Sequence, residues 1–368
     1  MALSSDTSVR FTSIIALLLL STGMMSHVIV MPILLETGGR DAWITALIGG
    51  AAITLLVPAL AYIMKTANRE PIPTWLARHV GGWTAPLLRI GVFAYCWALC
   101  AVTFVDTIAW IKSVVLLQTP VWFLCLLLII PCAWAALSPL HVLLRASALL
   151  LPPVVLFGFF VGVANMPRKN YSRLTPLLEH GALPVVHGLP YVLSGLSEIV
   201  LVLFIAHHLR RQPGGAGLLL ISWVLVGLTV GPLLGAISEF GPEESAMQRF
   251  PAYEQWSLVR IGDYVEHVDV LSIFQWMAGA FARISFTLSI IGSIGFRQPS
   301  AKKVRAAVIA ASITLCAAAM IPYNDAIFLD ILRFVYFPFT LTMAATFVFG
   351  LTIVAAVARR RQRRRGDV

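Results

Sequence analysis

The chain has 368 residues, of which 59% are hydrophobic and only 12% are charged. A soluble domain carries roughly a quarter of charged residues, and its interior is too small to hide this much apolar sequence. With a mean hydropathy of +0.86, the composition excludes a soluble globular protein. It predicts an all-α integral membrane protein that crosses the bilayer several times, as one polytopic domain over residues 1–368.

The formal net charge of +10 does not indicate nucleic-acid binding. Six arginines crowd the tail at 359–368, directly after an apolar stretch, with no aromatic residues between them for base stacking. Such a cluster is typical of a cytoplasmic anchor that faces anionic lipid headgroups. These residues are Arg359, Arg360, Arg361, Arg363, Arg364 and Arg365.

Ten apolar runs are each long enough for one membrane span, which needs about 20 residues. With a cytoplasmic N-terminus, most lysines and arginines fall on the inner side and most acidic residues outside, so both termini are predicted to be cytoplasmic. Arg168, Lys169 and Arg173, in one outer loop, are the exceptions. The expected spans are roughly 11–35, 42–64, 84–112, 120–139, 142–165, 187–209, 214–239, 268–296, 303–323 and 327–358.

The longest segment between spans, about 240–267, is acidic and is expected outside the membrane. From Phe250 onward, apolar and aromatic side chains recur at helical spacing, which favours a helix lying in the outer interface. An ordinary solvated loop is the alternative. The predicted apolar face consists of Phe250, Tyr253, Trp256, Ile261, Tyr264, Val265 and Val268.

Short polar, glycine-containing stretches interrupt the first and sixth spans, at 21–26 and 194–198. Paired interruptions at corresponding places of two five-span halves, here about 11–165 and 187–323, indicate an inverted-repeat transporter with its ligand site at the breaks. Close packing of helices through small residues explains the same composition equally well. The candidate ligand-binding residues are Thr22, Gly23, Met24 and Ser26 in the first stretch, and Ser194, Gly195, Ser197 and Glu198 in the second.

Among the charged residues within spans, Asp106, Glu198 and Arg283 are also candidate ligand-binding residues. A charge at the bilayer centre costs on the order of 2.5–3.5 kcal/mol, so it usually faces a cavity or a partner. Asp106 lies toward the outer end of its span, where solvation at the interface would explain it. Glu198 and Arg283 lie near the middle of theirs, and we expect them to pair across the pocket. A structural ion pair, a substrate contact and a proton site at Glu198 are all compatible with the sequence.

No metal-ligand spacing, cofactor motif or catalytic constellation stands out among the histidines, the five cysteines and the carboxylates. The sequence therefore predicts no metal, no cofactor and no enzymatic activity, and a membrane-embedded enzyme is only a distant alternative.

Two segments resemble one known family. The segment 36–44, ETGGRDAWI, resembles the AGRDAW connector of the spore germination permeases, the B subunits of endospore germinant receptors. The segment 250–254, FPAYE, followed by 261–264 and by the run from Val268 to Ser285, resembles the outer helix that leads into the eighth span of that family. The family belongs to the amino acid–polyamine–organocation superfamily.

This resemblance implies a LeuT-like five-plus-five inverted repeat, with broken helices one and six and a substrate held between spans one, three, six and eight. The family's break in span one falls on Gly23 to Ser26, and its span-six "GE" pattern falls on Ser197-Glu198, where serine replaces the glycine. Its basic residue in span eight, often lysine, falls on Arg283.

The resemblance also implies a function. The protein would bind a small germinant such as an amino acid and signal to an A-type membrane subunit and a C-type lipoprotein, in the cell membrane or the inner spore membrane. An ion-coupled amino-acid transporter that uses the same pocket is the alternative.

Overall fold

The structure is a computed structural model that describes residues 11–209, 214–260, 268–296 and 300–365, and its regular structure is helical. Helices suit an apolar chain because each pairs its backbone N–H and C=O groups within its own segment. The α-helices are α1 (Phe11–Met24), α2 (Met31–Gly38), α3 (Ala42–Thr54), α4 (Val57–Ala67), α5 (Ile72–His79), α6 (Thr84–Trp110), α7 (Val121–Leu137), α8 (Leu140–Ala164), α9 (Leu183–Ser197), α10 (Val202–Ile205), α11 (Gly215–Phe240), α12 (Pro242–Met247), α13 (Pro251–Ser257), α14 (Val270–Ile294), α15 (Ala301–Ala319), α16 (Asp325–Ile331) and α17 (Phe337–Arg365). Three π-helical segments are η1 (Met25–Ile29), η3 (Ile111–Val115) and η8 (Leu332–Tyr336), and two of the 3₁₀ segments are η2 (Gly39–Asp41) and η6 (Glu198–Leu201).

Seven helical stretches of the described chain are long and apolar enough to cross a membrane, where the sequence predicted ten spans. The first stretch, Ser13–Ala67, has 55 residues and includes two predicted spans. α7 has only 17 residues, and α15 begins with three basic residues, Lys302, Lys303 and Arg305. All ten predicted runs are helical, but their assignment as ten crossings stays a prediction.

The outer surface of the bundle is apolar, as expected for a protein that contacts lipid. Only 6% of the apolar window in the stretch that contains α8 is buried, whereas 78% is buried in each of the stretches that contain α1 and α9. Large apolar side chains such as Ile130 on α7 and Phe159 on α8 are 62% and 72% exposed. Together with the seven stretches, this surface identifies a multi-pass membrane protein.

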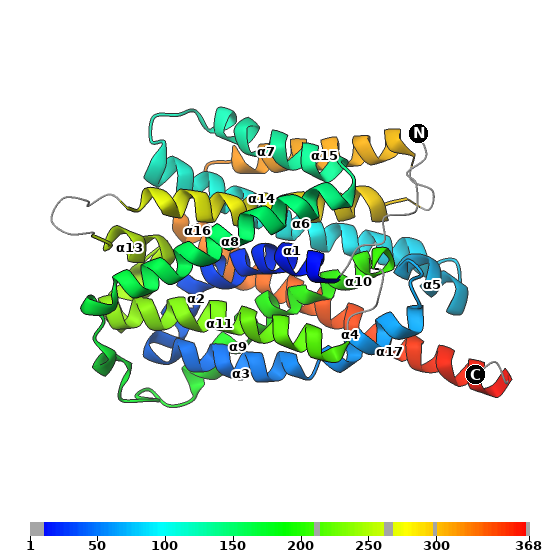
Figure 1. Ribbon diagram of the computed structural model, residues 1–368, viewed down its shortest axis with the longest axis horizontal. Helices are drawn as coiled ribbons and strands as arrows, with labels where there is room; N and C mark the ends of the chain where they lie inside the picture. The colour runs from blue at the N-terminus through cyan, green and yellow to red at the C-terminus, as the bar shows by residue number, and fades with distance from the viewer. Residues whose placement is uncertain (1–10, 210–213, 261–267, 297–299, 366–368) are drawn as a thin grey trace.

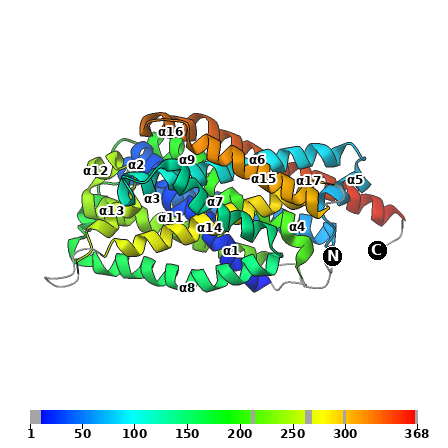
Figure 2. The ribbon, with the colours of Figure 1, turned by 90° about the horizontal axis from the view of Figure 1, so that it is seen from above.

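The long helices run roughly along one direction, so the bundle has two distinct ends (Figure 1). α1 begins and α17 ends at the same end, where α5 and the start of α15 also lie, and the last turns of α17 project beyond the other helices (Figures 1 and 2). α2, α12, α13 and α16 lie toward the opposite end (Figures 1 and 2).

Helix α14 lies at the centre of the bundle and packs against α1, α6, α7, α8 and α15. α9 packs against α2, α3 and α17. Its contact with α3 depends on Gly49, because an added Cβ there would lie 2.4 Å from Cγ1 of Val192, closer than real Cβ contacts come. This close approach fixes α9 beside α3 and so positions the start of η6.

The predicted outer helix over 250–268 is only partly present. α13 ends at Ser257, and the predicted face residues Ile261, Tyr264 and Val265 lie outside the described residues. Trp256 is 3% exposed and contacts the aromatic rings of α8, so this part of the face packs on protein and not on lipid.

Candidate functional site

A buried ion pair joins Arg283 of α14 to Glu198, the first residue of η6. The Arg283 side chain is fully buried and that of Glu198 is 1% exposed. Nη2 of Arg283 donates to Oε1 of Glu198 at 2.6 Å, and Nη1 donates to Oε2. The pairing predicted from the sequence is confirmed, and it neutralises two charges that would each be costly alone.

Arg283 also binds three further elements. Its Nε donates to Oγ1 of Thr103 on α6 at 2.6 Å. Nη1 donates to the carbonyl of Ser21 on α1 at 3.0 Å, and Nη2 donates to the hydroxyl of Tyr336 on η8 at 3.1 Å. With the two bonds to Glu198, all five guanidinium N–H groups have partners. One side chain therefore ties α1, α6, η6, α14 and η8 together.

The two predicted interruptions appear as changes of helix type. α1 continues to Met24 and passes into the π-helix η1, and α9 continues to Ser197 and passes into the 3₁₀-helix η6. Both changes occur at the C-terminal edge of the predicted stretches, and the chain stays helical through them. The π and 3₁₀ patterns keep backbone groups paired, which removes the need for an unwound segment.

Three hydroxyl groups near the first interruption are buried and have no hydrogen-bond partner among the described residues. They belong to Ser21, Thr22 and Ser26, which are at most 2% exposed. The hydroxyl of Tyr95 on α6 has none either, and it lies within electrostatic reach of Glu198. Buried polar groups are nearly always paired, so such a group calls for a ligand or water.

Three other candidate residues take part in helix packing. An added Cβ on Gly23 would lie 3.4 Å from the Leu228 side chain of α11, and one on Gly195 would lie 3.4 Å from Cγ of Met25. Met24 covers Gly279 of α14. These contacts fit the helix-packing explanation of the small residues.

The serines of the sixth predicted span are already bonded. The hydroxyl of Ser194 lies 2.5 Å from that of Thr340 on α17, and the hydroxyl of Ser197 donates to the Ser194 carbonyl at 2.8 Å. Ser194 and Ser197 therefore stabilise the approach to η6 in this state.

Asp106 belongs to a second ion cluster. It is 1% exposed, so the expectation that solvation at the interface explains it is wrong. Its Oδ1 pairs with Nη2 of Arg249, which lies between α12 and α13, and Nε of Arg249 pairs with Oδ1 of Asp325 at 3.2 Å. The other oxygen of Asp106, Oδ2, is buried without a hydrogen-bond partner.

Sequence reasoning missed Arg249. Its guanidinium lies 4.5 Å from the ring centroid of Phe250 and 5.0 Å from that of Phe328. Partial burial lowers its pKa, but the carboxylates of Asp106 and Asp325 raise it more, so the net pKa lies above the usual value and the cation is retained. The only local signal was a basic residue within an acidic segment, next to an aromatic residue.

An aromatic layer lies beside this cluster. The rings of Trp110 on α6 and Trp276 on α14 stack with centroids 4.2 Å apart, and Phe250 meets Trp276 edge-on. Trp276 precedes Arg283 by two turns of α14, about 10 Å. The layer and Arg249 therefore close the bundle on the side of α12, α13 and α16.

Comparisons of this chain with a family model and with individual proteins point to the same family. A family model described as spore germination protein matches residues 7–327. Spore germination protein XB of Bacillus anthracis is 36% identical over 352 residues, which cover 95% of this chain and 97% of the relative. Spore germination protein KB of Bacillus subtilis strain 168 is 24% identical over 267 residues, covering 69% and 70%. Spore germination protein YndE of the same strain is 22% identical over 306 residues, covering 82% of each chain.

Proposed function

This chain belongs to the spore germination permease family, and on that premise we propose that it acts as the B subunit of a germinant receptor. It binds a small germinant, an amino acid or a similar zwitterion, within the helix bundle. The occupied state is then passed to A-type and C-type partner subunits. Membership in a permease family favours binding over catalysis.

The observation that carries this proposal is the set of unpartnered hydroxyls beside the Arg283–Glu198 pair. Among the described residues, no group bonds to the hydroxyls of Thr22 and Ser26, and the carbonyl of Ser21, directly before Thr22, binds Arg283. A ligand with a carboxylate and an ammonium group supplies partners for both kinds of group. Gly23, Met24, Ser194, Gly195 and Ser197 then form the walls of the site, and Asp106 lies on the route from outside.

A LeuT-like fold is part of the proposal. In it, ten crossings form two inverted halves within one domain; the halves are about 11–165 and 187–323, and the tenth predicted span, 327–358, follows the second. The changes of helix type at Met25 and Glu198 support it, since they occur in the first and sixth predicted spans. We also propose that both termini are cytoplasmic and that the protein resides in the cell membrane or the inner spore membrane.

An ion-coupled amino-acid transporter is the second candidate. Helix interruptions beside a buried carboxylate are as suitable for moving a substrate as for sensing one. Flux of radiolabelled amino acids into proteoliposomes distinguishes the two, because a sensor binds its ligand without net transport.

The test of the binding site uses Thr22→Val and Ser26→Ala. Each change removes a hydroxyl that no group of the described residues bonds to, so thermal stability should be kept. Affinity for the germinant should fall up to about tenfold per variant, because one hydrogen bond contributes about 0.5–1.5 kcal/mol. Binding is measured with each of the twenty radiolabelled standard amino acids on protein in lipid nanodiscs.

Thr229→Val is the matched control, because the Thr229 hydroxyl is also buried but donates to the Leu225 carbonyl within α11. This control should keep the wild-type affinity. Wild-type affinity in both Thr22→Val and Ser26→Ala would refute the site, and binding of none of the twenty amino acids to the wild-type protein would refute the ligand class.

A further inference from the structure

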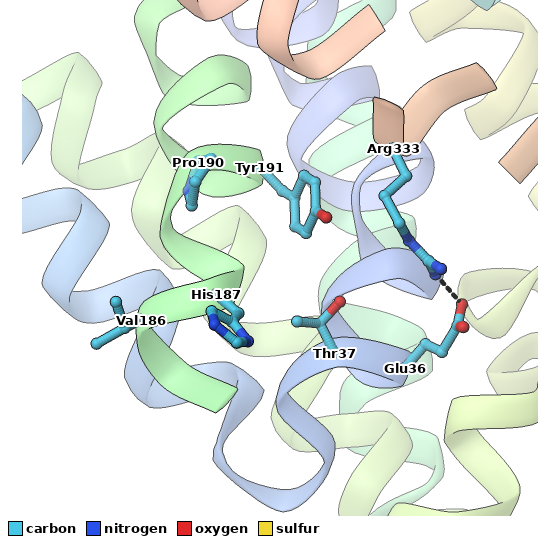
Figure 3. Close-up of a pocket in the computed structure, with 7 residues that line it drawn as sticks. All are labelled: Glu36, Thr37, Val186, His187, Pro190, Tyr191 and Arg333. Atoms are coloured by element: carbon cyan, nitrogen blue, oxygen red, sulfur yellow. Dashed lines mark ion pairs between the residues drawn. The ribbon is translucent and has the colours of Figure 1, made fainter. Parts of the chain in front are cut away.

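A cavity lies between α2, α9 and η8, and the Arg283–Glu198 pair is not part of its lining (Figure 3). Its volume is about 620 Å³, within the range of small-molecule sites. In Figure 3, an ion pair between Arg333 and Glu36 borders one side and His187 lies on the other, with Tyr191 and Thr37 between them. None of these residues belongs to the candidate site described above.

The Arg333–Glu36 ion pair of this cavity can exchange its partners for the charged groups of a ligand. Nη2 of Arg333 lies 2.5 Å from Oε2 of Glu36, and the two side chains are 22% and 46% exposed. Partly solvated pairs of this kind are weak. In addition, Nε of Arg333 is buried and has no hydrogen-bond partner in the part of the chain that the structure describes, so the guanidinium has a donor that Glu36 does not use.

We propose that this cavity is a second binding site, for a small zwitterion of the amino-acid class. The ligand carboxylate binds the Arg333 guanidinium and its ammonium group binds the Glu36 carboxylate, so both charges exchange partners and neither is left unpaired. A simple anion or cation would leave one of them without a partner. The ring of Tyr191, with Val186 and Pro190, offers an apolar wall to the ligand side chain.

The same elements reach the Arg283–Glu198 pair. Tyr336 follows Arg333 by three residues on η8 and binds Arg283. Tyr191 packs on Phe337, with ring centroids 5.3 Å apart. A ligand that moves Arg333 therefore acts on η8, the helix that holds Tyr336. The cavity, named here the outer station, is in this way coupled to the inner site at the Arg283–Glu198 pair. The coupling to the inner site rests on the proposed function, whereas ligand binding in this cavity shares with that function only the ligand class.

Protection of an engineered cysteine tests the cavity directly. Thr37→Cys, in a background without the five native cysteines, is labelled with a membrane-impermeant thiol reagent in nanodiscs. One or more of the twenty standard amino acids, at saturation, should slow labelling about fivefold or more. The deaminated and the decarboxylated analogues of that amino acid should not. Ser172→Cys, exposed outside the cavity, should show no protection.

Added to Thr37→Cys, either Arg333→Gln or Glu36→Gln should abolish protection, whereas Arg40→Gln, which breaks the ion pair with Glu179, should keep it. Thr22→Val should also keep it, which separates this cavity from the proposed inner site. Absence of protection by every amino acid, or protection lost in Thr22→Val but kept in Arg333→Gln, would overturn the proposal. So would protection by phosphatidylethanolamine alone, since the zwitterion would then be a lipid headgroup.

Discussion

Arg283 is a buried cation whose hydrogen-bonding capacity is used entirely by the protein. It cannot donate to a ligand carboxylate without giving up a bond to Glu198, Thr103, Ser21 or Tyr336. Direct ligand contact is therefore more favourable at the unpartnered hydroxyls of α1. Arg283 instead couples the positions of the elements that it binds, because a shift of any one of them changes its hydrogen bonds.

The Arg283–Glu198 pair predicts strong coupling in a double-mutant cycle. Glu198→Gln or Arg283→Met alone leaves one buried charge uncompensated and should cost about 3–5 kcal/mol. The double variant leaves no charge, so it should lose clearly less than the sum of the two. The measurement is thermal or denaturant unfolding of the four proteins in the same detergent.

Additive losses would contradict the pairing as an energetic unit. If Glu198→Gln folded normally but abolished the pH dependence of ligand binding, while Arg283→Met behaved independently, Glu198 would be a proton site instead. Reversing the charges is a poor rescue, because a carboxylate at position 283 would face the Ser21 carbonyl, which is also an acceptor.

Among the elements, the connection between α12 and α13 closes one end of the bundle. Arg249 joins this connection to α6 through Asp106 and to α16 through Asp325. Beneath it, Trp276 is held by a hydrogen bond from its Nε1 to Oγ1 of Thr107. A ligand that enters from this end has to pass these contacts.

Arg249→Gln should therefore increase access to the interior. It removes the charge that compensates Asp106, at an expected cost of about 1–3 kcal/mol. Thr107→Cys, at a buried position, should then react with an impermeant reagent about fivefold faster or more, since 1.4 kcal/mol is a factor of ten and 1 kcal/mol is about a factor of five. Lys169→Gln, which breaks the Lys169–Glu239 pair on α11, is the control and should not change the rate. Equal labelling rates in all three proteins would show that Arg249 does not close this end.

Helix positions were predictable because hydropathy is a local property of the chain. The run expected at 84–112 is helical over 84–115, and that expected at 214–239 is α11. The partner of Asp106 was not predictable, because Arg249 lies 143 residues away and only the fold brings them together. Thr103 and Tyr336 were missed for the same reason. The pairing of Glu198 with Arg283 was accessible because two opposite charges in apolar spans have few other partners.

The whole molecule has one basic and one acidic end. α5, the start of α15 and the end of α17 lie at one end (Figure 1), and they hold Arg78, Lys302 and Arg361. α12 and α16 lie toward the other, with Glu244 and Asp325. Because α1 begins toward the basic end and α17 ends there, we expect both termini to lie on the same side of the membrane.

The positive-inside rule predicts that the basic end is cytoplasmic. The test introduces Glu244→Cys on α12 or Arg361→Cys on α17, both exposed, into a background without the native cysteines. In intact cells an impermeant maleimide should label the cysteine at 244 and not the one at 361, and after the membrane is opened it should label both. The labelling rate of each cysteine in opened membranes is the control for differences in intrinsic reactivity between the two positions. Labelling at 361 alone in intact cells would invert the orientation, and the outer station at Arg333 would then face the cytoplasm. Labelling at both positions in intact cells would contradict the arrangement of the two ends on opposite sides of the bilayer.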